Sequence, residues 1–193
     1  MTRVETAASP GMALSAAEHS QGDANAGLTL LEYGDFECSA CIQAEPLTQH
    51  LVNTLGHRLR FVFRHFPLME VHPHAELAAE ATEAAAAQGQ FWPMHHRLFA
   101  HGHHLDLPAL ASCAQAVGLD MRRFNGEMAD RIYTQRVQEH RRAGQHSGVR
   151  ATPAFFLNGV PVDVSFGFER LEHAVHAALA DGGSPVQDQT LQR

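Results

Sequence analysis

Two short apolar runs in the first third of the chain predict a pair of buried β-strands. The first run covers residues 28–33 and the second covers 59–66, where apolar positions partly alternate. Residues from about 40 to 55 lie between them and predict a helix, which Pro46 should kink and Gly56 should end. A strand–helix–strand order predicts a right-handed unit in which the two strands are parallel.

Helical patterns then take over, and a strand signal returns only near the C-terminus. Several alanine-rich or amphipathic segments between about 70 and 147 predict a block of helices with no strand inside it. Two short apolar runs flank Asn158-Gly159, a pair that is typical of a tight β-hairpin turn. A last amphipathic helix is expected over 168–180. We therefore expect an α/β protein: a mixed sheet with an inserted α-helical subdomain.

Length and composition indicate the number of domains and exclude some classes of binding partner. The chain has 193 residues, of which 45% are hydrophobic, so one domain with a sizeable core is expected. We expect a flexible N-terminal arm over 1–26, the folded domain over 27–181 and a flexible tail over 182–193. The net charge of −7 argues against nucleic acid as a partner. No apolar stretch is long enough for membrane insertion, and a monomer is expected.

The N-terminal segment bears on the compartment. It contains acidic residues and no apolar run of signal-peptide length. The sequence therefore predicts a cytoplasmic protein, or a periplasmic one if an export signal has been removed.

The strongest chemical signal is a pair of cysteines, Cys38 and Cys41, separated by Ser39-Ala40. The pair follows the first predicted strand and opens the first predicted helix. Unpaired N–H groups and the helix dipole stabilise a thiolate at that position. A second thiol one turn later can close a small disulfide ring, so the pattern predicts a reversible dithiol–disulfide couple.

Other readings of the cysteines and histidines stay open at this point. A structural zinc site needs four ligands, and the third cysteine, Cys113, stands alone on an apolar helix face, where a buried inert thiol is expected. Histidines could complete a zinc set with Cys38 and Cys41. Five histidines crowd near one predicted helix end, and a solvated polar helix end is expected there rather than a metal site; they are His95, His96, His101, His103 and His104.

The whole pattern resembles the thioredoxin fold, in the branch with a helical insertion typified by disulfide oxidoreductases of the DsbA type. The segments that carry the resemblance are EYGDFECSAC at 32–41, HFPL at 65–68, HPHA at 72–75, GQFW at 89–92 and TPAFFLNG at 152–159. Together they span most of residues 28–180, in the family's order.

The resemblance implies roles for residues outside the cysteine pair. Pro153 is expected to follow a cis peptide bond and to face the sulfurs, while the Thr152 backbone offers strand-like hydrogen bonds to an extended substrate. Ser39, Ala40 and Phe36 are expected to contact the substrate. Glu32, an isolated carboxylate inside the first strand, is expected to accept or donate the proton of Cys41.

The resemblance also implies a mechanism, in which Cys38 is the nucleophile and Cys41 the resolving thiol. Substrates would be cysteine-containing proteins or thiols, and no cofactor or metal is expected. The sequence does not identify the redox partner, which could be a thioredoxin or glutathione system. Ser39-Ala40 matches neither the Gly-Pro pair typical of thioredoxins nor the Pro-His pair of DsbA-type oxidants. We therefore expect a protein less oxidising than the DsbA type, working inside the cell as a reductase or redox-balance protein.

Two other function classes remain open from the sequence. One is a non-redox zinc- or peptide-binding module that uses Cys38 and Cys41. The other is a glutathione-dependent enzyme on the same fold, which would keep its activity in a Cys41→Ser variant.

Overall fold

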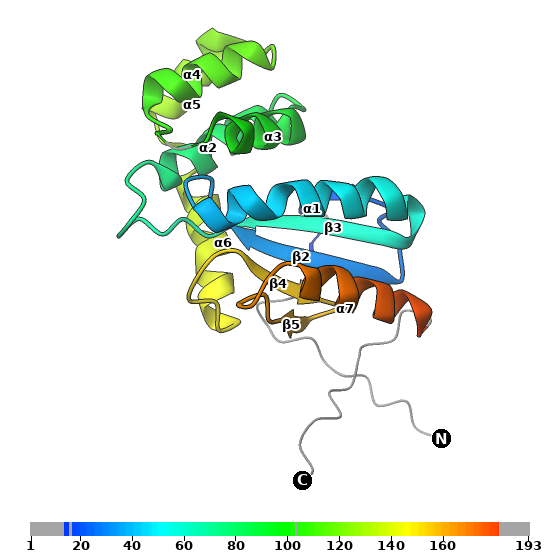
Figure 1. The fold of residues 1–193 in the computed structure, drawn as a ribbon. Helices are drawn as coiled ribbons and strands as arrows, with labels where there is room; N and C mark the ends of the chain where they lie inside the picture. Colours follow the sequence, from blue (N-terminus) through cyan, green and yellow to red (C-terminus); the bar gives the residue numbers. More distant parts are fainter. Residues whose placement is uncertain (1–13, 16, 103, 182–193) are drawn as a thin grey trace.

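A five-stranded mixed sheet forms the centre of the molecule (Figure 1). The computed structural model describes residues 14–15, 17–102 and 104–181. The strands lie in the order β1 (His19–Gly22), β3 (Leu59–His65), β2 (Leu28–Gly34), β4 (Ala154–Leu157) and β5 (Val160–Val162). The helices are α1 (Ser39–Leu55), α2 (Ala75–Ala86), α3 (Phe91–His101), α4 (Leu107–Ala116), α5 (Met121–Ala129), α6 (Thr134–His146) and α7 (Glu169–Ala180), and a 3-10 turn, η2 (Gly56–Arg58), follows α1.

The predicted β2–α1–β3 unit is confirmed. Strands β2 and β3 are parallel, with Leu30 beside Phe61, and β4 pairs antiparallel with the other edge of β2. The central position of β2 buries both of its faces, which is why the sequence shows a nearly continuous apolar run there. Helix α1 continues past Pro46 to Leu55, so the proline does not end it.

Helices α2 to α6 run between β3 and β4 without a strand, as the sequence predicts. In Figure 1, helices α2 to α5 gather on the side of α1 that faces away from the sheet, and α7 lies along the β4–β5 side. The mixed sheet with an inserted helical subdomain is therefore confirmed. None of the helices that the structure describes is long and apolar enough to cross a lipid bilayer.

The expectation of a flexible N-terminal arm over 1–26 is wrong at its C-terminal end, because strand β1 lies within it. Residues His19–Gly22 pair antiparallel with β3 and form an edge of the sheet. Their sequence, HSQG, has no apolar alternation, so the pattern could not reveal a strand. Polar contacts hold the segment instead: Glu18 forms a buried ion pair with Arg64 at 2.7 Å. Residues 1–13 of the arm and the tail over 182–193 lie outside the described residues.

Candidate active site

The loop between β2 and α1 sets the position of the cysteine pair. Cys38 is the N-cap residue of α1, and its backbone N–H donates to the Asp35 carbonyl at 3.2 Å. The Asp35 carboxylate in turn accepts hydrogen bonds from the backbone N–H groups of Glu37 and Leu68, both at 2.8 Å. The loop is therefore tied to its own helix and to the segment after β3, which fixes the direction of the Cys38 side chain.

The two thiols have opposite acidities. Hydrogen bonding from the Cys41 thiol is the largest influence on Cys38, and it lowers the Cys38 pKa to about 5, against the effect of burial. Backbone N–H groups of Ala40 and Cys41, in the first turn of α1, act in the same direction. Cys38 is therefore a thiolate at neutral pH, which is the nucleophilic form.

Cys41 is fully buried, and burial is the main reason that its pKa lies well above the usual value for a thiol. The hydrogen bond with Cys38 and the charge of Glu32 raise the Cys41 pKa further. Cys38 retains a small exposed fraction of 8%, so an attacking group can reach Cys38 and not Cys41. This division matches the nucleophilic and resolving roles expected for the pair.

The Thr152–Pro153 loop faces Cys38, although Thr152 comes 114 residues after Cys38 in the chain. The Thr152–Pro153 peptide bond is cis, and the Cys38 Sγ lies 3.3 Å from the Thr152 carbonyl oxygen, which can accept a hydrogen bond from the thiol form of Cys38. Thr152 also contributes to the low pKa of Cys38. The structure thus brings Thr152 and Cys38 together, as the resemblance implied.

Glu32 lies in the middle of β2 and is 2% exposed. Burial, assisted by the negative charges of Glu45 and Cys38, raises the pKa of this carboxyl well above its usual value. The charge of Glu32 is one of the influences that raise the pKa of the Cys41 thiol, so the carboxyl and the resolving thiol interact electrostatically. A carboxyl with a raised pKa beside a buried thiol can exchange a proton with it.

The proposed substrate contact through Phe36 is wrong. Phe36 is 1% exposed and packs in the core against Phe63 and Phe99, with ring centroids 5.5 and 4.8 Å away. An apolar residue next to a catalytic loop can face either way, and here the fold turns it inward. Ser39 is exposed and Ala40 is partly exposed, so these two residues form the surface beside Cys38.

Sequence reasoning missed two acidic residues that support this loop. Asp35 contacts His72 Nδ1 at 2.8 Å, and Glu37 contacts His74 Nδ1 at 3.0 Å. Both carboxylates are buried, so they join the active-site loop to the segment before α2. The matching spacing of the two pairs, Asp-x-Glu and His-x-His, is the signal that could have revealed them.

The histidine cluster also differs from expectation. His95 is not part of a solvated helix end: it is fully buried, in contact with the rings of Phe36, Phe63 and Phe99. His103 lies outside the described residues. Cys113 is buried on α4, as predicted for an inert thiol.

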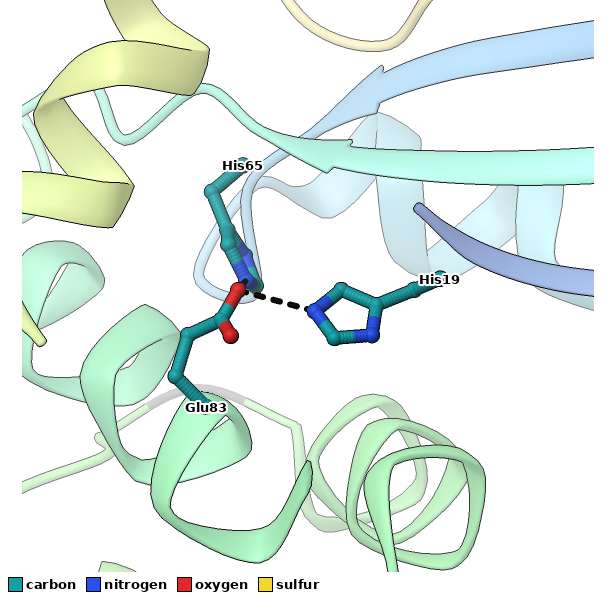
Figure 2. A group of neighbouring side chains, drawn as sticks. All are labelled: His19, His65 and Glu83. Carbon is teal, nitrogen blue, oxygen red and sulfur yellow. Dashed lines mark hydrogen bonds and ion pairs between the residues drawn. The ribbon is translucent and has the colours of Figure 1, made fainter. Parts of the chain in front are cut away.

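Two groups of three side chains could hold a metal ion within the described part of the chain, and neither group contains a cysteine. One is Glu45, His95 and His96. The other is His19, His65 and Glu83, where both imidazoles point at one Glu83 oxygen (Figure 2). A zinc site built from Cys38, Cys41 and histidines therefore finds no support in the geometry.

Comparison with known proteins agrees with this architecture. The family described as Thioredoxin matches residues 15–177, so the chain belongs to the thioredoxin family. The Na⁺/H⁺ antiporter NhaA 1 of Salinispora arenicola is 43% identical over 163 residues, which is 84% of this chain and 25% of that protein. The antiporter NhaA of Herminiimonas arsenicoxydans is 40% identical over 142 residues, 74% of this chain and 22% of that protein. The chain thus spans about a quarter of the length of these curated relatives.

Solved structures show the same fold. Wolbachia pipientis alpha-DsbA1 superposes with a TM-score of 0.78 and 17% identity, covering 91% of this chain and 97% of that one. Bacillus subtilis BdbD in its oxidised form has a TM-score of 0.75 and 17% identity, covering 84% and 93%. The thiol-disulfide exchange protein alpha-DsbA2 of Wolbachia pipientis has a TM-score of 0.74 and 19% identity, covering 84% and 88%. The chain therefore has the fold of DsbA-like thiol-disulfide oxidoreductases.

Proposed function

We propose that this chain exchanges disulfides with cysteine-containing protein substrates through Cys38 and Cys41. The observation that carries the proposal is the pairing of an accessible thiolate at a helix N-terminus with a buried, protonated thiol that donates to it. A structural disulfide or a metal site has no need for that contrast. The fold shared with proteins titled as thiol-disulfide exchange proteins supports the same function.

The exchange can be followed atom by atom from the oxidised chain. A substrate thiolate attacks the Cys38 sulfur of the Cys38–Cys41 disulfide, and Cys41 leaves and takes a proton, for which Glu32 is the nearby donor. A second substrate thiolate then attacks the substrate sulfur of the mixed disulfide and releases Cys38 as a thiolate. Two electrons pass from substrate to chain. Reduction of a substrate is the reverse sequence, with Cys41 attacking Cys38.

The Cys38 pKa bears on the preferred direction. A lower pKa stabilises the reduced form and makes the disulfide more oxidising; the nucleophilic cysteine has a pKa of about 7 in thioredoxin and about 3.5 in DsbA. The value of about 5 found here lies between them. If this acidity alone set the difference, the reduction potential would lie roughly 50–60 mV above the thioredoxin value of about −270 mV. We therefore propose a couple of intermediate potential, less oxidising than DsbA.

A groove near the site supports a proposal for where a substrate binds. A groove of about 530 Å³ is lined by Phe66, Leu68, Arg141, Val149 and Arg150, among others. Leu68 is hydrogen-bonded to the active-site loop, and Arg150 precedes Thr152 by two residues, so two lining residues of the groove are close in the structure or in the chain to residues of the site. We propose that an extended substrate segment lies here and pairs with the Thr152 backbone, and that one chain suffices, because all of these residues belong to it.

Trapping the mixed disulfide tests the proposal. A Cys41→Ser variant keeps the nucleophile and cannot resolve, so its Cys38 thiolate should attack a peptide disulfide, release one peptide thiol and accumulate as a mixed disulfide with the other, while Cys38→Ser should form none. Cys113→Ser is the matched control and should exchange like the parent chain. Equal exchange by Cys38→Ser would refute the proposal. Turnover of a glutathione-linked small molecule by Cys41→Ser, without protein exchange, would favour the glutathione-dependent alternative.

The curated relatives favour a more specific second candidate. Their matching segment is about a quarter of chains named as Na⁺/H⁺ antiporters. We propose that this chain acts on cysteines of a membrane transporter of that kind. In cells, the Cys41→Ser trap should then appear in a mixed disulfide within the membrane fraction. Recovery of the trapped adducts exclusively with non-membrane proteins would exclude this candidate and leave the general function standing.

A further inference from the structure

A second cluster of chemically active side chains lies outside the cysteine pair, between α1 and α3. It consists of Glu45 on α1 and of His95 and His96 on α3. His96 Nδ1 lies 2.7 Å from Glu45 Oε1, and His95 Nδ1 lies 3.7 Å from the same oxygen. The two Nδ1 atoms are 3.4 Å apart. Two imidazole nitrogens and one carboxylate oxygen therefore converge on one point.

The size of this triangle suits a small transition-metal ion. A point about 2 Å from all three atoms exists just off their plane, and Zn²⁺ binds imidazole nitrogen and carboxylate oxygen at about 2.0–2.2 Å. The burial is graded: His95 is fully buried, Glu45 is mostly buried, and His96 is about one third exposed. An ion could enter past His96 and keep a fourth position open to water.

The His95 nitrogen that faces the cluster, Nδ1, lacks a good hydrogen-bond partner. Its Nε2 is also buried without a partner among the described residues, and an ion on Nδ1 would leave Nε2 unchanged. Its Nδ1 has only the 3.4 Å approach to another imidazole and a 3.7 Å approach to Glu45, which is too long for a hydrogen bond. A buried imidazole in this state loses free energy on folding, and a metal ion on Nδ1 would give that nitrogen a strong partner.

Gln21 supplies a further contact that a metal-binding histidine requires. Its side-chain nitrogen lies 3.5 Å from His96 Nε2, while its oxygen is buried without a partner in the part of the chain described. The two amide orientations are not distinguished by shape, and the flipped one places the oxygen opposite Nε2. His96 bound to a metal through Nδ1 would carry its proton on Nε2 and donate it to that oxygen. Such outer contacts orient metal-binding histidines.

We propose that Glu45, His95 and His96 form a binding site for a divalent transition-metal ion of the Zn²⁺ class. The site shares no residue with the cysteine pair and does not depend on the proposed redox function.

The other histidine–carboxylate group, His19, His65 and Glu83, does not invite the same inference. There each imidazole has a good contact with Glu83 Oε1, at 2.9 and 3.0 Å (Figure 2), and Arg136 holds the other oxygen at 2.9 Å. The carboxylate already has three partners, and a cation would meet the charge of Arg136. This group is better explained as a set of ion pairs that joins β1 and β3 to α2.

The test is a titration of the disulfide-oxidised protein, in which Cys38 and Cys41 cannot bind metal. Co²⁺ should bind in a 1:1 ratio with the visible absorption of a low-coordinate site, and Zn²⁺ should displace it. Trp92, the single tryptophan, lies 5.0 Å from the His95 ring and 6.0 Å from the His96 ring, so Co²⁺ should also quench its fluorescence.

Two variants and one control make the test specific. His96→Gln and Glu45→Gln should each weaken Co²⁺ binding at least tenfold, because each removes one of three ligands, while circular dichroism shows that they fold. His50→Gln, at an exposed position of α1, should bind like the parent chain. Binding with no quenching of Trp92, unchanged affinity in both variants, or no binding at all would overturn the proposal.

Discussion

The low pKa of Cys38 rests mainly on the hydrogen bond from the Cys41 thiol, and this dependence can be tested with two substitutions at one position. Cys41→Ser replaces the thiol by a hydroxyl of similar shape that can still donate. Cys41→Ala removes the donor. Both variants lack Cys41, so the Cys38–Cys41 disulfide cannot form in either of them.

The expected difference follows from the strength of that bond. A hydrogen bond to a charged group contributes about 1.5–3 kcal/mol, and about 1.36 kcal/mol corresponds to one pKa unit. The Cys38 pKa should therefore stay near the parent value of about 5 in Cys41→Ser and rise by roughly one to two units in Cys41→Ala. At pH 5.5 the thiolate fraction would fall from about three quarters to roughly a tenth.

The assay is the pH dependence of alkylation by iodoacetamide, read by mass, together with thiolate absorbance in the ultraviolet. Urea unfolding of both variants controls for a loss of packing at the buried position. If both variants titrate at the same pH, the Cys41 donor does not control the acidity of Cys38. The helix N-terminus and Thr152 would then be the main source of the low pKa.

Three further predictions concern buried charges. Glu32→Gln should raise the free energy of unfolding at pH 7 by about 1–3 kcal/mol, because the raised pKa shows that the fold disfavours this carboxylate. The same variant should prolong the lifetime of the mixed disulfide in a quenched time course, because it lacks the proposed proton-exchanging group. Glu18→Ala should cost about 3–5 kcal/mol in urea unfolding because it removes the carboxylate that pairs with the buried Arg64 guanidinium, whereas Glu127→Ala, which breaks an exposed pair, should cost less than about 1 kcal/mol; equal losses would contradict this ranking. His140 is buried, and burial is the main reason that its pKa is lowered to about 3. As the pH falls below about 6.5, the unfolded chain therefore binds a proton at this histidine before the folded chain does. Acidification from pH 7 to 5 should lower the free energy of unfolding by about 2 kcal/mol through this group, and a His140→Phe variant should not show that loss.

Much of the fold could be predicted because the relevant signals are local. The apolar runs of β2 and β3, the Asn-Gly turn between β4 and β5, and the helical periodicity of α2 to α6 each follow from neighbouring residues. Strand β1 escaped prediction because its four residues are polar and its stability comes from pairing with β3 and from the buried contact between Glu18 and Arg64. β3 and Arg64 lie about 40 residues further along the chain, so a pattern of neighbouring residues cannot predict these contacts.

The active site divides in the same way. The sequence by itself determined the two cysteines and their place at the start of α1, since the spacing and the strand-to-helix boundary are local properties, and the order of attack is a prediction from the same pattern. Only the tertiary structure decided that Phe36 faces the core, that Asp35 and Glu37 hold the loop through His72 and His74, and that His95 is buried against Glu45. The physical reason is that burial and long-range pairing, and therefore side-chain direction and acidity, depend on residues brought together only when the helices pack against the sheet.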